Sequence, residues 1–253
     1  MVITRVSIDE RILAIDVGAT NMKFCHVDEF GALLEVVRRR RTHYPCTPWQ
    51  LVEVLSARIT RSKCSQVGIG FPGDVEHGRV TNAFNLARPG GITTDVDIAL
   101  DELWRGFEIQ EALVDATDRD VRVVNDADLA ALGCCRELGT EMVLTLGTGV
   151  GNALMIEGAL QQVESVGARS SVDGRTFDVV LGERSRAQNE VEWRESVVRA
   201  VDDFAQEFGA TIVHLAGGNA KRLAPVSFAD LPTPVVIHGN DASLRGVAKL
   251  FYA

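Results

Sequence analysis

The chain has 253 residues, of which 46% are hydrophobic and 24% are charged, a composition typical of a globular protein with one large or two modest domains. Its net charge of −9 would repel polyanions, so we expect no nucleic-acid partner. No run of roughly 18 uninterrupted apolar residues occurs, and residues 1–13 are charged where a signal peptide would be apolar, so we expect no membrane span and no export. The five cysteines are odd in number and lack zinc-ligand spacing, which favours the reducing cytoplasm over a disulfide framework.

Short strands and helices alternate along the first half of the chain. Three adjacent strands are predicted where β-rich runs are separated by turns that contain glycine, and they span residues 12–16, 22–27 and 33–39. A helix with Thr47 as its N-cap and Pro48 at its first position is predicted next. This helix covers 47–61, and it is followed by a strand at 66–71, loops over 72–97 and a helix near 97–115.

The second half repeats this alternation. A strand over 120–126 runs directly into a helix over 126–139, which Asn125 or Asp126 would cap and Gly139 would end. The remaining predicted elements are a hairpin over 141–160, a long helix over 183–209 ending at Gly209, strands at 211–218 and 234–239, and a closing helix from Asp241. Two similar layouts therefore predict an α/β protein with a domain boundary near residue 115, giving domains 1–115 and 116–253 with a cleft between them.

Small polar residues follow the first buried strand. Because Gly18 has no side chain, its backbone amide can approach a phosphate closely. The side chains of Thr20 and Asn21 offer short donors, and Lys23 offers a cation. Asp16 would repel such a ligand unless a divalent cation such as Mg²⁺ lay between them. The alternative is that the turn is only a tight hairpin.

Two further turns strengthen the phosphate interpretation. The stretch LGTGVGN places Gly147, Thr148, Gly149 and Gly151 between two apolar strands, where their backbone could cradle phosphoryl oxygens. Gly217 and Gly218 follow a later strand and would open a helix whose N-terminus favours an anion. The GIGFPG stretch lacks the helix that a dinucleotide site requires, and no P-loop motif occurs.

Asp126 is the candidate catalytic acid. It lies at a strand-to-helix junction, where a carboxylate can be held ionised and aimed at a ligand. The alternative is a helix cap, which is the commoner role of such residues. A positioned general base together with Mg²⁺ is most of what phosphoryl transfer to a hydroxyl needs.

Six ordered motifs resemble those of the ROK sugar kinases in the actin/hexokinase/Hsp70 ATPase superfamily, and the short length and NDAD are most similar to the polyphosphate/ATP glucokinases. The motifs are DVGATNMK, GFPGDVEHGRVTNAFNL, VVNDADLAAL, LTLGTGVGNALMIEGAL, LAGGN and DASLRGVAKLF. The resemblance implies two actin-like, ribonuclease H-like domains with a central cleft, the last helix, about 241–253, packing back on the first domain. It also implies a cytoplasmic enzyme that is a homodimer, uses Mg²⁺ with ATP or polyphosphate as donor, and phosphorylates glucose or a related hexose.

The resemblance also implies roles for individual residues. Asp126 corresponds to the base that deprotonates the sugar hydroxyl, and Asn85 and Asn125 correspond to sugar contacts. The two phosphate loops and the nucleotide turn correspond to the three glycine-containing turns above, with Asp16 near the metal. The zinc-binding cysteine cluster of many ROK proteins is missing, so no zinc is expected.

One segment departs from the family pattern. Where the family has Glu-x-Gly-His, this chain has VESVGARSSVDG over 163–174. Glu164 takes the place of the glutamate, while Ala168 or Arg169 falls where the histidine should be and Ser171 lies near a later acid. Because that histidine holds sugar hydroxyls, the alternatives are a kinase for a modified sugar or polyol, or a sugar or nucleotide sensor without catalysis.

Two other features have open interpretations. The run Arg38–Arg41 is either a solvated strand edge that discourages aggregation or a track for polyphosphate. The five histidines are scattered in the sequence, and we expect them to be structural or surface groups.

Overall fold

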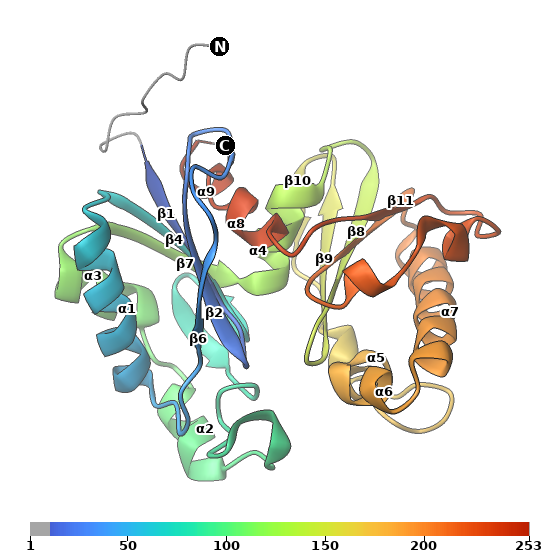
Figure 1. Cartoon of the computed structure of the whole chain (residues 1–253), viewed down its shortest axis with the longest axis horizontal. Coiled ribbons are helices and arrows are strands. Elements are labelled where there is room, and N and C mark those ends of the chain that lie inside the picture. The colour runs from blue at the N-terminus through green and yellow to red at the C-terminus, as the bar shows by residue number, and fades with distance from the viewer. Residues whose placement is uncertain (1–10, 253) are drawn as a thin grey trace. The chain divides into compact units, whose positions relative to one another are not determined.

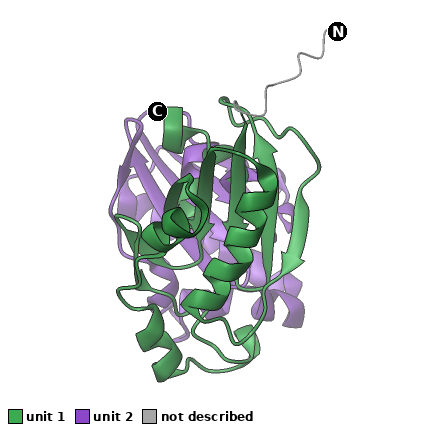
Figure 2. Ribbon diagram, turned by 90° about the vertical axis from the view of Figure 1, so that its left-hand side faces the viewer, with its two compact units in different colours: residues 1–129, 244–253 green, residues 130–243 purple. Residues whose placement is uncertain are grey.

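The chain forms two compact units. The computed structural model describes residues 11–252. Residues 1–10, which belong to the N-terminal segment behind the expectation of no export, lie outside the described residues. Unit 1 is the chain up to Leu129 together with the segment from Leu244, and unit 2 is Ala130–Ser243 (Figure 2).

Unit 1 contains a five-stranded sheet in the order β3-β2-β1-β4-β7 (Figure 1). Its strands are β1 (Ile12–Val17), β2 (Asn21–Val27), β3 (Arg38–Arg41), β4 (Gln66–Phe71) and β7 (Asp120–Asn125). The first three run antiparallel, whereas β4 and β7 run parallel to β1. A small hairpin, β5 (Asp74–Glu76) and β6 (Arg79–Asn82), follows β4. Because β7 belongs to this sheet, the division of the chain falls after Leu129 rather than near residue 115.

The strand predicted at 33–39 is mostly wrong. Leu33 forms a single bridge with Val27, and only the arginines of β3 make a strand. The Asp28 carboxylate accepts from the backbone N–H groups of Phe30 and Ala32 in the turn before this segment.

Helices cover both faces of this sheet. α1 (Pro48–Ser62) begins as predicted, with Thr47 as N-cap in a capping box and Pro48 at its first position. The single helix predicted near 97–115 is instead α2 (Ile98–Trp104) and α3 (Ile109–Thr117), because Gly106 has a φ of +79° and its N–H bonds the Val80 carbonyl.

The two faces of β4 differ in side-chain size. Val67, Ile69 and Phe71 belong to the hydrophobic core that includes residues of α1 and α3. On the other face, a Cβ at Gly68 would lie 2.5 Å from Val247, and a Cβ at Gly70 would lie 3.1 Å from Leu129. The glycines therefore let α4 (Asp126–Cys134) and the closing helices α8 (Ala242–Gly246) and α9 (Lys249–Tyr252) approach the sheet.

Unit 2 repeats the sheet topology of unit 1, with the order β10-β9-β8-β11-β12. Its strands are β8 (Thr140–Leu146), β9 (Val150–Ile156), β10 (Ala159–Gln161), β11 (Ile212–Ala216) and β12 (Val235–Ile237). As in unit 1, an antiparallel meander is extended by two parallel strands, so the β8–β9 turn corresponds to the β1–β2 turn. This duplication underlies the two similar layouts in the sequence.

Three helices of unit 2 follow the meander. They are α5 (Phe177–Leu181), α6 (Glu183–Gln188) and α7 (Glu190–Phe208). The helix predicted over 183–209 is broken at Asn189, whose side chain accepts from the Glu192 N–H and caps α7. Gly209 ends α7 in the left-handed conformation, as predicted. Trp193 anchors the helix to the core by donating to the Leu181 carbonyl at 2.7 Å.

Two other predicted helix limits are wrong. α4 ends at Cys134 instead of Gly139, because the Glu141 carboxylate binds the backbone N–H groups of Arg136 and Leu138 and holds the next residues as a turn. The helix predicted after β11 is only a 3₁₀ turn, Ala220–Arg222. The predicted contribution of a helix dipole to anion binding at this turn is therefore wrong.

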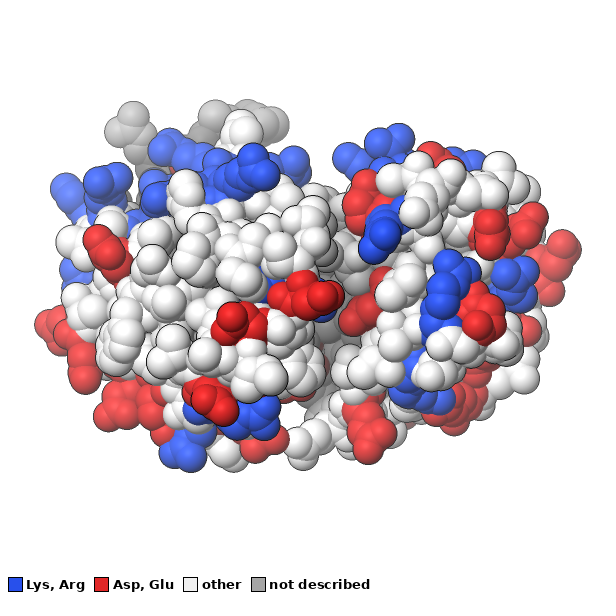
Figure 3. All heavy atoms as spheres, turned by 90° about the horizontal axis from the view of Figure 1, so that it is seen from below, with Lys and Arg blue, Asp and Glu red and all other residues white. Residues whose placement is uncertain are grey.

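The surface carries charges of both signs. Acidic and basic side chains are interspersed on the face shown in Figure 3, and neither kind covers it. Within residues 11–252, no helix combines the length and apolar character needed to cross a membrane.

Candidate functional site

The β1–β2 turn of unit 1 is held tightly by the segment after β3. The Gly18 N–H bonds the Asn21 carbonyl at 3.1 Å, and a Cβ at Gly18 would lie 2.8 Å from that same oxygen. Thr42 Oγ1 donates to the Gly18 carbonyl at 2.7 Å, and the Thr42 N–H bonds the Thr20 carbonyl. Thr20 and Asn21 are exposed. The turn therefore presents these two predicted phosphate contacts to solvent on a fixed backbone.

Asp16 and Lys23 form an ion pair beside this turn. They face each other across β1 and β2, and Lys23 Nζ lies 2.7 Å from Asp16 Oδ2. Asp16 is buried, and it also stands in register with Gly70 on β4. A Cβ at Gly70 would lie 3.3 Å from the Asp126 Cα, so this glycine leaves room for Asp126 between the strands. Gly70 was not among the predicted site residues, although it lies in the GIGFPG stretch and opens the family motif GFPGDVEHGRVTNAFNL.

Asn125, and not Asp126, caps α4. Asn125 Oδ1 accepts from the backbone N–H groups of Ala127 and Asp128, and Asn125 Nδ2 donates to the Gly73 carbonyl at 2.9 Å. The carboxyl group of Asp126 is therefore not needed to cap the helix.

The carboxyl group of Asp126 has a strongly perturbed pKa. Burial, together with the nearby negative charge of Asp16, raises its pKa to about 7, although Lys23 and the Ala127 N–H oppose the shift. The residue nevertheless keeps partial exposure to solvent. A carboxyl group that titrates near neutral pH can accept a proton from a substrate hydroxyl.

Asn85 is exposed and lies in the loop after β6. Its backbone carbonyl is 3.1 Å from the Tyr44 hydroxyl, which also lies 2.7 Å from the carbonyl of Ala19 in the β1–β2 turn. Unit 1 thus links the loop of this predicted sugar contact to the first phosphate turn through one tyrosine.

The pH profile tests the assignment of Asp126. Because the ionised carboxylate is the active form of a general base, we expect kcat/KM to rise with pH and level off above an apparent pKa near 7. Steady-state assays at subsaturating acceptor between pH 5 and 9 measure this limb. A profile that is flat down to pH 5 would contradict the assignment.

In unit 2, the turn over 147–149 corresponds to the first phosphate turn. The Asn219 side chain donates to the Gly147 carbonyl at 2.9 Å, and the Glu183 N–H bonds the same oxygen. Asp178 accepts from the Val150 N–H at 2.8 Å. A Cβ at Gly147 would meet no atom within 4 Å, so one side of this turn is open to a ligand.

Close packing explains another glycine of this turn. A Cβ at Gly149 would lie 2.2 Å from Asp178 Oδ1, whereas Gly151 lies within β9 opposite Thr145. Thr148 shares the turn, and its carbonyl accepts from the Glu183 N–H at 3.2 Å. Asp178 and Asn219 were not predicted, because only long-range folding brings them to the turn.

Gly217 and Gly218 follow β11 beside the same turn. Gly217 has a φ of +89°, and a Cβ there would lie 2.5 Å from the Leu146 carbonyl, at the end of β8. The Asn219 N–H bonds that carbonyl at 2.9 Å. Unit 2 therefore brings together its second and third predicted phosphate-binding turns.

Asn152 binds the segment 163–174, which departs from the family pattern. Its side chain accepts from the Val166 N–H at 2.9 Å and donates to the Glu164 carbonyl at 3.1 Å. The side chain of Glu164, the predicted sugar contact, is exposed. Arg169 Nη1 and Nη2 each lie 2.8 Å from a carboxylate oxygen of Glu207 on α7. Arg169, which with Ala168 is a candidate for the position of the family histidine, thus binds α7 in this structure.

Replacing Arg169 tests this arrangement. Since both partners are more than a third exposed, Arg169→Ala should change the free energy of unfolding by less than about 1 kcal/mol. Its effect on the acceptor KM should stay within about twofold, because the guanidinium is engaged by Glu207. Glu207→Gln serves as the matched control in the same kinetic and urea-unfolding measurements. A large rise in the acceptor KM confined to Arg169→Ala would show instead that the arginine contacts the acceptor.

Comparison with known proteins agrees with this geometry. The sequence model of the ROK family matches residues 12–167. The polyphosphate glucokinase of Mycobacterium tuberculosis is 26% identical over 250 residues, covering 92% of this chain and 88% of the relative. The crystal structure of the inorganic polyphosphate/ATP-glucomannokinase from Arthrobacter sp. strain KM has a TM-score of 0.79 and 27% identity, covering 96% of this chain and 98% of the other. A ROK family glucokinase from Streptomyces griseus, solved with glucose and AMPPNP, has a TM-score of 0.73 and 17% identity over 95% and 98% of the two chains.

The chain therefore belongs to the ROK family, and it has the actin-like fold of the ROK sugar kinases. Among these proteins it resembles the polyphosphate glucokinases.

Proposed function

We propose that this protein is a kinase that transfers a phosphoryl group from ATP or polyphosphate to a hydroxyl of glucose or a related hexose, with Asp126 as general base. The observation that carries the proposal is the environment of Asp126, whose pKa is raised to about 7 and whose helix is capped by a different residue. The names of the relatives, a polyphosphate glucokinase and a polyphosphate/ATP-glucomannokinase, support the choice of donor and acceptor.

In the proposed reaction, one proton moves to Asp126 and one phosphoryl group moves to the acceptor. Asp126 takes the proton of the acceptor hydroxyl as the hydroxyl oxygen forms its bond to the terminal phosphorus of the donor, and the bond from that phosphorus to the leaving phosphate oxygen breaks. Asn85, Asn125 and Glu164 are proposed to contact the sugar. Exclusion of water by the bound acceptor would favour transfer over hydrolysis.

The glycine-containing turns are proposed to bind the donor. In unit 1 the exposed Thr20 and Asn21 offer donors, and Lys23 offers a positive charge. In unit 2 the open side of Gly147 admits a phosphate. All four arginines of β3 are exposed, so they give unit 1 a cationic strand edge suited to a polyanionic donor.

Mg²⁺ fits the acidic side of the first turn. Asp16 supplies a carboxylate oxygen, the kind of ligand that Mg²⁺ prefers. The negative charge of Asp16 disfavours ionisation of Asp126, so a cation bound at Asp16 would relieve that repulsion. When bound, Mg²⁺ supplies neutralisation of charge on the donor phosphates. We also propose a cytoplasmic homodimer, a location that the five thiols support because none forms a disulfide.

A second candidate is a kinase for a modified sugar or a polyol. The observation that favours it is the engagement of Arg169 by Glu207, in the segment where the family places its sugar-binding histidine. The reaction and the role of Asp126 would be the same, and only the acceptor would differ.

Mass spectrometry of products tests both candidates. The protein is incubated with Mg²⁺, with ATP or polyphosphate, and with a panel of hexoses, aminosugars and polyols. We expect one or more phosphorylated hexoses. Phosphorylation of aminosugars or polyols alone would favour the second candidate, and binding of sugar and donor without any product would indicate a sensor.

A further inference from the structure

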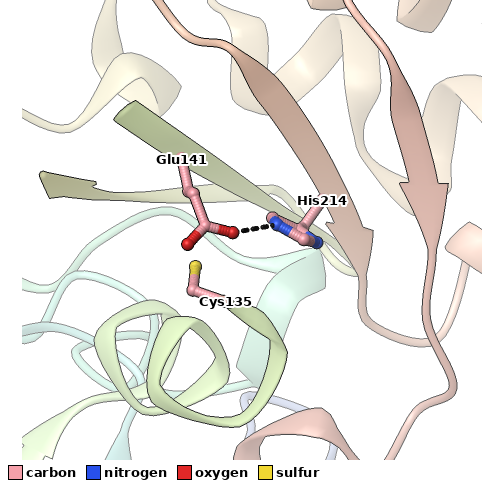
Figure 4. A group of neighbouring side chains, drawn as sticks. All are labelled: Cys135, Glu141 and His214. Carbon is pink, nitrogen blue, oxygen red and sulfur yellow. Dashed lines mark hydrogen bonds and ion pairs between the residues drawn. The ribbon is translucent and has the colours of Figure 1, made fainter. Parts of the chain in front are cut away.

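Unit 2 buries a group of potential metal ligands that the proposed reaction does not use. Cys135 follows α4, Glu141 lies on β8 and His214 lies on β11, and Figure 4 shows their polar atoms pointing toward one another. The three ligand atoms all lie within 4.8 Å of one another. The exposed fractions of the His214 and Glu141 side chains are 0% and 1%. Sequence spacing could not reveal this group, because the fold brings its members together.

The sheet explains why these polar groups meet. Side chains alternate along a strand, and the neighbours Met142 and Val213 point into the core that includes residues of α7. Glu141 and His214 therefore point to the opposite face, where the chain leaves α4 at Cys135. The turn after α4 is fixed there by Glu141 itself, through the N–H groups of Arg136 and Leu138.

The chemistry of the three groups selects the metal. A thiolate, an imidazole and a carboxylate are the usual protein ligands of Zn²⁺, whereas Mg²⁺ and Ca²⁺ prefer sites made of oxygen. Tetrahedral zinc with bonds of about 2.0–2.3 Å places its ligand atoms roughly 3.5 Å apart. The existing separations of up to 4.8 Å thus exceed what the ion requires by at most about 1.3 Å.

Hydrogen bonds already fix the Glu141 carboxylate in the position where it could bind such an ion. Its Oε2 accepts from the Arg136 N–H and from His214 Nε2, and its Oε1 accepts from the Leu138 N–H. A carboxylate has about four acceptor positions, so the backbone donors can hold it while a metal replaces the bond to His214.

His214 has the partner that an imidazole ligand usually has. Its Nδ1 lies 2.8 Å from Nε2 of His238, which follows β12. A metal-bound histidine commonly makes such a bond with its second nitrogen, which fixes the ring and its tautomer.

We propose that Cys135, Glu141 and His214 bind one Zn²⁺ ion that ties the end of α4 to β8 and β11, with His238 orienting His214. This site is separate from the cysteine cluster of other ROK proteins, whose absence led us to expect no zinc. The inference stands independently of the proposed function, because none of its residues belongs to the phosphate turns or to the sugar contacts.

Metal binding to the intact protein tests the proposal. The protein is stripped with EDTA, equilibrated with Zn²⁺ without nucleotide, desalted and assayed by inductively coupled plasma mass spectrometry. We expect about one zinc per chain. The cobalt-loaded protein should show a thiolate-to-cobalt charge-transfer band. Zinc content near zero, or cobalt bound without that band, would overturn the proposal.

Two cysteine variants assign the ligand. Cys135→Ser should lose the charge-transfer band, whereas the matched control Cys134→Ser, at a buried neighbouring cysteine outside the cluster, should keep it. His238→Gln should weaken zinc binding by about 10–100-fold while keeping the band. Circular dichroism checks that each variant is folded, and a substitution to alanine at the same position replaces any cysteine-to-serine variant that is not. Retention of the band in Cys135→Ser, or its loss only in Cys134→Ser, would refute the assignment.

Discussion

Asp126→Asn is expected to lower kcat by about 10²–10⁴-fold, the usual contribution of a general base. The substitution keeps the shape of the side chain but removes its ability to accept the proton of the acceptor hydroxyl. Donor binding, measured by calorimetry, should be unchanged within about twofold, because the donor contacts are made by the glycine-containing turns. Stopped-time product assays over a range of acceptor concentrations separate kcat from KM.

The same variant should be more stable than the wild type at high pH. The folded-state pKa of Asp126, about 7, lies above its ordinary value of 3.8, so the folded protein holds this proton more tightly than the unfolded chain. The stabilisation from this proton is present below about pH 4 and is lost as the pH rises through 7. Asp126→Asn should therefore raise the free energy of unfolding by about 1–4 kcal/mol at pH 8 and by much less at pH 4.

Asp128→Asn is the matched control. Asp128 lies on the same helix, and burial together with the charge of Asp74 raises its pKa to about 6. This variant should also gain stability at pH 8, yet it should retain near-normal kcat. Equal loss of turnover in both variants would mean that the effect comes from the helix and not from a base at residue 126.

Gly217→Ala is expected to have the other large effect. Its φ of +89° disfavours any residue with a side chain, and the new Cβ would lie 2.5 Å from the Leu146 carbonyl, a backbone atom that cannot swing away. The free energy of unfolding should fall by about 1–3 kcal/mol. Turnover should fall by at least about tenfold, because the phosphate turn that continues from Leu146 moves with it.

Gly218→Ala controls for the loss of a glycine at the neighbouring position. A Cβ there would have no neighbour closer than 3.9 Å, and its φ is not in the left-handed range. Urea unfolding of the two variants should therefore differ clearly, with Gly218→Ala close to the wild type. Destabilisation of both variants to the same extent would contradict the packing described for Gly217.

Local signals in the sequence predicted the features that depend on near neighbours. Thr47 and Pro48 begin α1, Gly209 ends α7, and Asp126 lies at a strand-to-helix junction, because each feature involves only a few consecutive residues. The duplicated sheet also followed from the order of the strands. The positive φ of Gly106 and the cap at Asn189 were not predicted, and they divide helices that periodicity alone joined.

The features that sequence reasoning missed depend on long-range contacts. Gly70 matters because β1, β4 and β7 bring it between Asp16 and Asp126, and Asp178 matters because α5 returns it to the β8–β9 turn. His214, expected to be a structural or surface group, is fully buried, and its contact with Glu141, 2.8 Å from His214 Nε2 to Glu141 Oε2, was not predicted. Local sequence patterns and spacing do not predict such long-range contacts, so they are found only in the folded structure.

Phosphorus NMR tests the central claim most directly. The wild-type protein and Asp126→Asn are each mixed with glucose, Mg²⁺ and either ATP or polyphosphate, and the spectra are followed with time. We predict that a sugar phosphate-monoester resonance grows with the wild type for at least one donor and is almost absent with Asp126→Asn. If the wild type binds glucose and donor but forms no monoester, or if Asp126→Asn forms it at the same rate, the assignment of a hexose kinase with Asp126 as its base is wrong.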